Sequence, residues 1–206
     1  MSCIKSKFLK SLIVILGSLV MGAGVAIAVC GRQGADPLAV VWDGMSNVFP
    51  ITVGQANVII SIILFIIVFI FDRKQLSWGT ILNPIFCGIS TDFVMSLVST
   101  PSNIYMQIAQ SILGVIIIGI GVGIYTSVDF GKGTYDALVF GISNKLNIPF
   151  FIVRMISDGL MLITGYLMGG KIGLSTVFAV FCIGKIISLV YEKSKMYELK
   201  FLALNN

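Results

Sequence analysis

Apolar and polar residues follow one another along the chain in long blocks. Six mainly apolar stretches approach the roughly 20 residues that an α-helix needs to cross a hydrocarbon core. They cover about residues 8–30, 51–71, 78–98, 104–127, 148–168 and 172–191. Two shorter segments of mixed polarity, about 36–49 and 134–146, follow the first and fourth stretches. These two are too short to span, so the pattern predicts six membrane-spanning helices and two amphipathic or re-entrant ones.

Local signals agree with these boundaries. Asp36 and Asp136 lie near the starts of the short segments, where an acidic residue suits the positive end of a helix dipole. Pro50 and Pro149 precede the second span of each half, a place where proline costs no backbone hydrogen bond. Pro84 falls inside the third span, where we expect a kink that serves either packing or a cavity.

Two segments of the chain are copies of one unit. Residues 15–47 align with residues 112–144 without a gap, and eleven of the 33 aligned pairs are identical. Unrelated apolar, glycine-rich stretches would share about 3–4, so duplication is the better interpretation. The shared glycine pairs are Gly17/Gly114, Gly22/Gly119, Gly24/Gly121, Gly34/Gly131 and Gly44/Gly141.

The duplication has a topological consequence. Within a single membrane domain (1–206), repeat 1 covers about 8–98 and repeat 2 about 104–193, and each holds three expected spans. A unit with an odd number of spans starts its second copy on the opposite side of the bilayer. The sequence therefore predicts two inverted three-helix repeats, each with a short helix after its first span.

Composition fixes the broad class. The chain is 57% hydrophobic and 11% charged, which is too apolar for a soluble domain of 206 residues. We expect an all-α polytopic membrane protein whose main partner is the lipid bilayer. The net charge of +5 reflects basic residues in short loops, so topology explains it and nucleic-acid binding is not expected.

The basic residues also predict orientation. With the N-terminus in the cytoplasm, ten loop or tail lysines and arginines fall inside and two outside, which indicates N-in and C-in in an inner membrane. The inner set is Lys5, Lys7, Lys10, Arg73, Lys74, Lys132, Lys145, Lys193, Lys195 and Lys200, and the outer set is Arg32 and Lys171.

The chain has few residues of the types that form metal or catalytic sites. Histidine is absent and the four cysteines are scattered without a CxxC pair, so no metal site, no cofactor and no His-based catalytic triad is expected. The protein is not expected to be an enzyme. Gly22, Gly24, Gly119 and Gly121 have the small side chains that let helices approach closely in lipid, and we assign them to packing of the repeats. A backbone-lined substrate path is the alternative.

Charged residues within spans are the candidate binding site. Asp92, Arg154, Asp158 and Lys185 each cost about 2.5–3.5 kcal/mol at a helix centre and so need a partner or a role. Arg154 and Asp158 are four apart and able to pair on one helix face. Asn57 is the repeat 1 counterpart of Arg154 and adds an amide at membrane depth.

Structural explanations for the same residues stay open. Lys185 and Arg154 are near enough to span ends for their long side chains to reach the interface. The short side chain of Asp158 is unable to reach the interface. Two interpretations of Asp158 therefore stay open: a structural ion pair with Arg154, or binding of an ion or substrate. Asp92 is nearer an interface, where water can hydrate it.

The repeated motif resembles a known family. The stretches Gly22–Ala26, Gly34–Pro37 and Gly44–Ser46, repeated at Gly119–Gly123, Gly131–Thr134 and Gly141–Ser143, are similar to those of YczE/YitT-type bacterial membrane proteins. Thr134 departs from the pattern, which would have proline there. The resemblance covers almost the whole chain and implies an inner-membrane protein; it implies no activity, since that family is largely uncharacterised.

These features favour a small permease for an unknown small solute. Arg154, Asp158 and Lys185 would lie beside a central site, and two cations near an acid would suit an anionic or zwitterionic solute. The alternative is a non-transporting accessory or scaffold protein, or the substrate-capture subunit of a larger transport complex. Six spans are few for a transporter, and a homodimer or a partner membrane protein would supply the rest.

Overall fold

The computed structural model describes residues 2–130 and 132–204, with side chains for residues 7–130 and 132–196. Over that part the chain is helical and has no strand. Gly131, which the repeat alignment used, lies outside the described residues, as do the side chains of Lys5 and Lys200.

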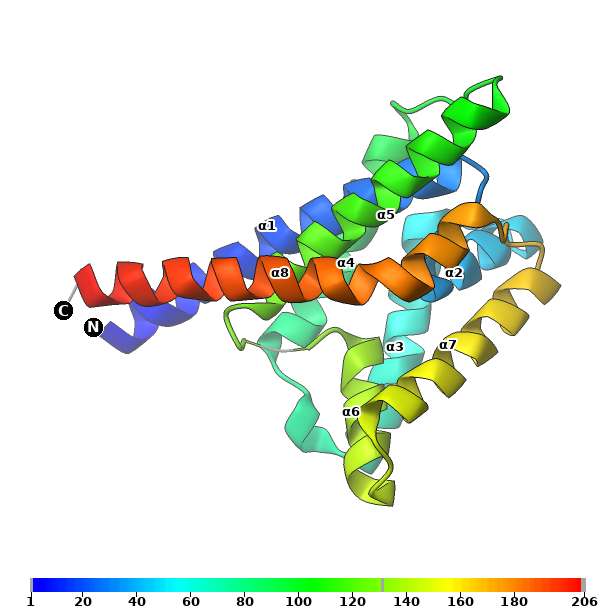
Figure 1. Cartoon of the computed structure of the whole chain (residues 1–206). Coiled ribbons are helices and arrows are strands. Elements are labelled where there is room, and N and C mark those ends of the chain that lie inside the picture. Colours follow the sequence, from blue (N-terminus) through cyan, green and yellow to red (C-terminus); the bar gives the residue numbers. More distant parts are fainter. Residues whose placement is uncertain (1, 131, 205–206) are drawn as a thin grey trace.

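The described helices match the expected long and short segments to within a few residues in most cases (Figure 1). In chain order they are α1 (Ser2–Cys30), α2 (Pro37–Val48), α3 (Val53–Phe71), the 3-10 helix η1 (Arg73–Gln75), α4 (Trp78–Met95), α5 (Ile104–Thr126), α6 (Thr134–Leu146), α7 (Phe150–Leu167) and α8 (Leu174–Leu204). By length and composition, α1, α3, α5, α7 and α8 are able to cross a membrane.

α4, the sixth expected span, is not among those five. It is 18 residues long and carries several polar residues, including Asn83, Thr91 and Asp92. Its Pro84 lies inside the helix, and the Asn57 amide of α3 donates to the Pro84 carbonyl at 3.0 Å. α4 is therefore held by hydrogen bonds to its neighbours, and its polar groups are satisfied within the protein.

Local sequence accounts for several helix ends. Thr52 and Gln55 form a capping box at the start of α3, which satisfies backbone amides that have no partner inside the helix. Pro37 opens α2, and Pro149 is the N-cap of α7. α6 ends at Asn147, whose backbone is left-handed, a conformation that asparagine tolerates better than most residues.

α1 and α5 form the centre of the molecule and run antiparallel (Figure 1). Their glycines face each other in two pairs. A Cβ on Gly17 would lie 2.9 Å from the Gly121 carbonyl oxygen, and one on Gly121 would lie 2.7 Å from the Gly17 oxygen. The pair Gly24 and Gly114 shows 2.8 and 2.6 Å. Only glycine allows the two backbones to approach so closely.

α4 and α8 pack on the outer sides of this pair, α4 on α1 and α8 on α5. A Cβ on Gly22 would lie 2.3 Å from the Cys87 carbonyl oxygen of α4. Its repeat counterpart Gly119 faces Ile183 and Ile186 of α8, at 3.6 and 2.8 Å. Of the glycines assigned to packing of the repeats, Gly24 and Gly121 lie between α1 and α5, which come from different halves of the chain. Gly22 and Gly119 instead pack against a helix of their own half, because α4 lies on α1 and α8 on α5.

The short helices pack across the molecule. α2 lies on α7, and α6 lies on α3, so each short helix contacts the second long helix of the other half. The remaining contacts are uneven: α3 packs against α4, whereas α7 and α8 hardly touch within the described part of the chain.

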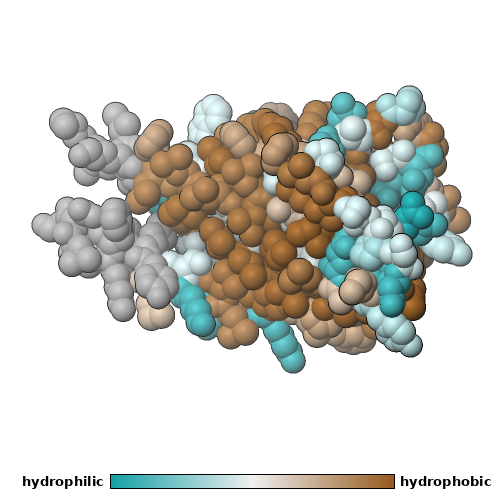
Figure 2. All heavy atoms as spheres, turned by 90° about the horizontal axis from the view of Figure 1, so that it is seen from above, coloured by the Kyte–Doolittle hydropathy of each residue, from teal (hydrophilic) through white to brown (hydrophobic). Residues whose placement is uncertain are grey.

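Polar loops collect at two ends of the molecule. At one end Lys10 donates to the Val128 carbonyl, Lys132 donates to Gln75, and Lys195 pairs with Asp129. At the other end Gln33 accepts from the Ser175 amide at 3.1 Å and Gln33 donates to Gln107. Figure 2 shows hydrophobic side chains covering the middle of one face, with hydrophilic ones gathered mainly at one end.

Candidate functional site

Arg154 and Asp158 of α7 form the pair that their spacing predicts. The Arg154 Nε donates to Asp158 Oδ2 at 3.2 Å, across one turn of the helix. α7 begins directly after Pro149, which places this pair in its first half, facing α6.

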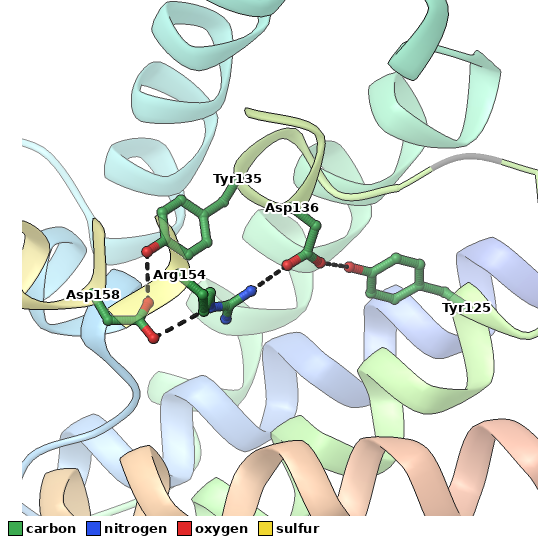
Figure 3. Close-up of polar contacts among 5 residues, drawn as sticks. All are labelled: Tyr125, Tyr135, Asp136, Arg154 and Asp158. Atoms are coloured by element: carbon green, nitrogen blue, oxygen red, sulfur yellow. Dashed lines mark hydrogen bonds and ion pairs between the residues drawn. The ribbon is translucent and has the colours of Figure 1, made fainter. Parts of the chain in front are cut away.

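The pair belongs to a longer chain of contacts (Figure 3). Arg154 Nη1 also donates to Asp136 Oδ1, in the first turn of α6. At one end of the chain the Tyr135 hydroxyl donates to Asp158 at 2.5 Å, and at the other the Tyr125 hydroxyl donates to Asp136 at 3.4 Å. The Arg154 guanidinium lies 4.7 Å from the Tyr135 ring centroid. One arginine therefore serves two carboxylates, and each carboxylate also accepts from a tyrosine.

The network is only partly buried. The side chains of Arg154, Asp136 and Asp158 are 29%, 23% and 19% exposed. These charged groups are therefore not sealed inside the described part of the protein. Burial raises the pKa of Tyr135, and its hydrogen bond to Asp158 raises it further, so its hydroxyl keeps its proton and remains a donor.

Asp36, the N-cap of α2, brings a third carboxylate to the same region. Its Oδ1 is buried and has no hydrogen-bond partner among the described residues. Burial raises the pKa of Asp36 to about 6; Arg154 opposes this rise, Asp158 adds to it, and the Leu38 and Ala39 amides oppose it. Asp36 comes from the first half of the chain, whereas Asp136, Arg154 and Asp158 come from the second.

The other expected site residues lie elsewhere. Asp92 accepts from the Thr52 hydroxyl at 2.6 Å and the Gly54 amide at 2.8 Å, so it fastens the start of α3 to α4. Asn57 is buried between α3 and α4 and accepts from Ser61 at 3.3 Å. Lys185 is exposed on α8. The structure therefore brings Arg154 and Asp158 together, and leaves Lys185, Asp92 and Asn57 outside the network.

Sequence reasoning missed four members of the site. Asp36 and Asp136 were interpreted only as helix-start residues, and Tyr125 and Tyr135 were not singled out. The two aspartates did carry a signal, since each lies near the start of a short helix that follows the first span of a repeat. The tyrosines carried none that separates them from ordinary core aromatics.

A known family covers nearly the whole of this chain. Residues 8–192 match the family described as "Family of unknown function (DUF6198)". The chain belongs to this family. The DUF6198 assignment confirms the expected resemblance to YczE-type proteins, because similar proteins include the "Uncharacterized membrane protein YczE" of Bacillus subtilis. That relative is 29% identical over 179 residues, which cover 86% of this chain and 83% of the relative.

Two further relatives extend the DUF6198 comparison. The "Uncharacterized protein YyaS" of Bacillus subtilis is 25% identical over 92% of this chain and 94% of its own length. An "Uncharacterized protein" of Haemophilus influenzae is 24% identical over 86% of this chain and 82% of its own length. No solved structure matches the chain. The membrane relative and the apolar helices together establish a multi-pass helical membrane protein.

Proposed function

We propose that this protein is a small inner-membrane permease built from two inverted three-span repeats. The observation that carries the proposal is the place of the charged network, where one arginine pairs with two carboxylates of the second half and lies within electrostatic range of Asp36 from the first half. Partly exposed charges at the junction of two pseudo-symmetric halves are typical of secondary transporters, which bind their substrate between repeats.

Reciprocal contacts support the repeat arrangement. Gly17 meets Gly121 and Gly24 meets Gly114, so each pair maps onto the other when the repeats are exchanged. The same holds for backbone hydrogen bonds: the Gly79 amide donates to the Phe130 carbonyl at 3.1 Å, as the Ser175 amide does to Gln33. Self-complementary contact between antiparallel helices requires a pseudo-two-fold axis across them, and therefore in the plane of the membrane.

The two polar ends support six crossings and common sides for the termini. The first turns of α1 lie near the C-terminal end of α5, where the Lys10 ammonium donates to the Val128 carbonyl. α4 begins at the same end of the molecule, where the Thr80 hydroxyl donates to the Lys132 carbonyl. The loop after α4 returns to the opposite end, where Gln107 of α5 meets Gln33. α4 therefore runs from one end to the other although it is less apolar than the remaining long helices.

The orientation has a direct test. With N-in and C-in, single cysteines replacing Lys74 and Lys132 in a background without native cysteines will react with a membrane-impermeant maleimide only after the inner face is exposed. A cysteine replacing Lys171 will react in intact cells. Labelling of positions 74 and 132 from opposite sides would contradict the inverted arrangement.

The site has a second test. A ligand is first found by screening a metabolite panel for thermal stabilisation of the detergent-purified protein, since a ligand of the folded state raises its apparent stability. Asp158→Asn is expected to weaken binding at least about tenfold, because removing one partner of a desolvated charge pair costs about 2–5 kcal/mol. Uptake into proteoliposomes should fall with it.

Asp129→Asn is the matched control for that substitution. Asp129 is 64% exposed and pairs with Lys195 outside the network, so its replacement should leave binding and uptake unchanged. Undiminished uptake by a correctly inserted Asp158→Asn protein would remove Asp158 from the site.

One observation favours the alternative of an accessory or substrate-capture subunit. In their most apolar windows 50% of α1 and α5 is buried, against 11% of α7 and 17% of α8. A second copy or a partner membrane protein would cover these helices as well as lipid does. Co-purification of a stoichiometric membrane partner, with no uptake by the isolated protein, would decide for this function.

A further inference from the structure

We propose that Asp36 alternately carries a proton and a small monovalent cation, so that the solute enters in exchange for a proton. This inference rests on the permease function proposed above and names its substrate class and its coupling ion. It starts from the one carboxylate of the site whose buried oxygen lacks a partner.

The surroundings of Asp36 compensate its charge only in part. Arg154 and Asp158 of α7 and Cys87 of α4 are titratable groups in electrostatic contact with it. The Leu38 and Ala39 amides favour its ionised form, and so does Arg154, whose guanidinium is already hydrogen-bonded to Asp136 and Asp158. Burial outweighs these contacts and favours the protonated form.

Charge balance at the site then selects the solute. With Asp36 ionised, its carboxylate and those of Asp136 and Asp158 are matched by the Arg154 guanidinium and by Lys132, which is in electrostatic contact with Asp136. One negative charge is then left over. A proton on Asp36 or a monovalent cation beside it removes that charge. The two forms therefore carry the same net charge, and one replaces the other one for one. An anionic solute would add a further negative charge to a site that already has an excess.

The cation that the sequence suggested for an anionic solute does not contribute here. Lys185 is exposed on α8, and the face of α8 that meets α5 carries Ile183, Ile186 and Val190 instead.

In the exchange, the proton on the Asp36 carboxyl leaves to water and the carboxylate takes the cation as its partner. No bond other than O–H is broken, and no oxidant or reductant is needed. Below the pKa of Asp36 the proton and the cation compete, so the apparent affinity for the cation should fall about tenfold for each pH unit. Above that pKa the affinity should be constant.

The test uses the full-length protein in detergent with sodium chloride or methylammonium chloride as the probe. Added to weakly buffered protein at pH 5, one of these salts should release close to one proton per chain, saturably, and choline chloride at equal ionic strength should not. The two arms distinguish an inorganic cation from an amine. Asp36→Asn should abolish the release, and Asp36→Glu should restore it.

A spectroscopic measurement covers the case in which Asp36→Asn does not fold. The infrared carbonyl band of a protonated carboxyl should be present in wild-type protein at pH 5 and absent at pH 8, and methylammonium or sodium should remove it at constant pH. Asp129→Asn, which changes an exposed carboxylate, should leave band and proton release unchanged.

The outcomes separate this inference from the permease function. Release that persists in Asp36→Asn, or release by neither cation, overturns the exchange, while uptake of another solute would keep the permease. Proton release in detergent without cation-driven pH change inside proteoliposomes supports exchange at Asp36 and overturns transport.

Discussion

The two junctions between a short helix and a long one are built from the same repeated segment, yet they pack differently. Where α2 meets α7, a Cβ on Gly44 would lie 2.6 Å from the Gly165 carbonyl oxygen. Where α6 meets α3, a Cβ on the equivalent Gly141 would meet nothing closer than Asp72, at 3.5 Å. The backbones of α2 and α7 are therefore in close contact at Gly44, whereas no backbone atom lies close to Gly141 at the α6–α3 junction.

One residue difference accounts for the wider spacing. The position of Gly165 in α7 corresponds to Val68 in α3, and the Val68 side chain is buried. Two glycines let backbones touch, whereas a valine on one side keeps them apart. The α6–α3 junction encloses a hollow of about 140 Å³, lined by Val68, Phe71, Asp72, Ala137, Leu138, Gly141, Ile142, Lys145 and Leu146.

The comparison shows that duplicated sequence fixes which helices meet but not how closely. For the permease proposed above, unequal packing at equivalent positions of the two halves is compatible with alternating access between inverted repeats. The hollow lies apart from the charged network, since neither Arg154 nor Asp158 lines it.

The sharpest way to test the difference is to add one methyl group at each junction. Gly44→Ala places a Cβ against backbone atoms of α7, which are unable to move aside, and should cost about 1–3 kcal/mol of unfolding free energy. The midpoint of thermal unfolding in detergent should fall accordingly.

Gly141→Ala is the matched variant at the equivalent position. Its Cβ finds ordinary van der Waals distance, and alanine favours a helix over glycine by about 0.5–1 kcal/mol. We therefore expect no loss of stability, or a small gain. Equal losses in the two variants would show that the junctions do not differ in solution.

A smaller effect should come from the cation–π contact across the loose junction. The Lys145 ammonium lies 4.7 Å from the Phe71 ring centroid, and both side chains are exposed, so the coupling should be about 0.5 kcal/mol. A double-mutant cycle of Lys145→Gln and Phe71→Leu measures it. The tight junction has Val48 and Met168 at these positions, and the cycle there should show no charge-dependent coupling.

Much of the fold was readable from the pattern of apolar residues. The long apolar helices and the two short helices followed from it, because helix periodicity is a local property. The contact of Arg154 with Asp158 was also readable, since residues four apart share a helix face. α4 was harder, since its polar residues are satisfied by other helices and weaken the apolar signal.

The rest of the site depends on tertiary structure. The chain folds back after α1 and after α5, so that Asp136 pairs with Arg154 and Asp36 comes within electrostatic range of it. No local sequence pattern shows which residues this folding back brings together. The sequence of α8 already indicates that Lys185 does not belong to the site. Ile183, Ile186 and Val190 form its packed stripe at helical spacing, and Lys185 lies off that stripe.

The glycine contact between α1 and α5 also bears on how such a chain arose. Through Gly17 and Gly24, α1 presents to α5 a surface equivalent to the one that α5 presents to α1 through Gly114 and Gly121. In the inverted arrangement proposed above, a half-length ancestor with this surface would bind a second, oppositely oriented copy of itself before any fusion joined the two genes. On the same proposal, either half produced alone should form a dimer with an oppositely oriented copy of itself.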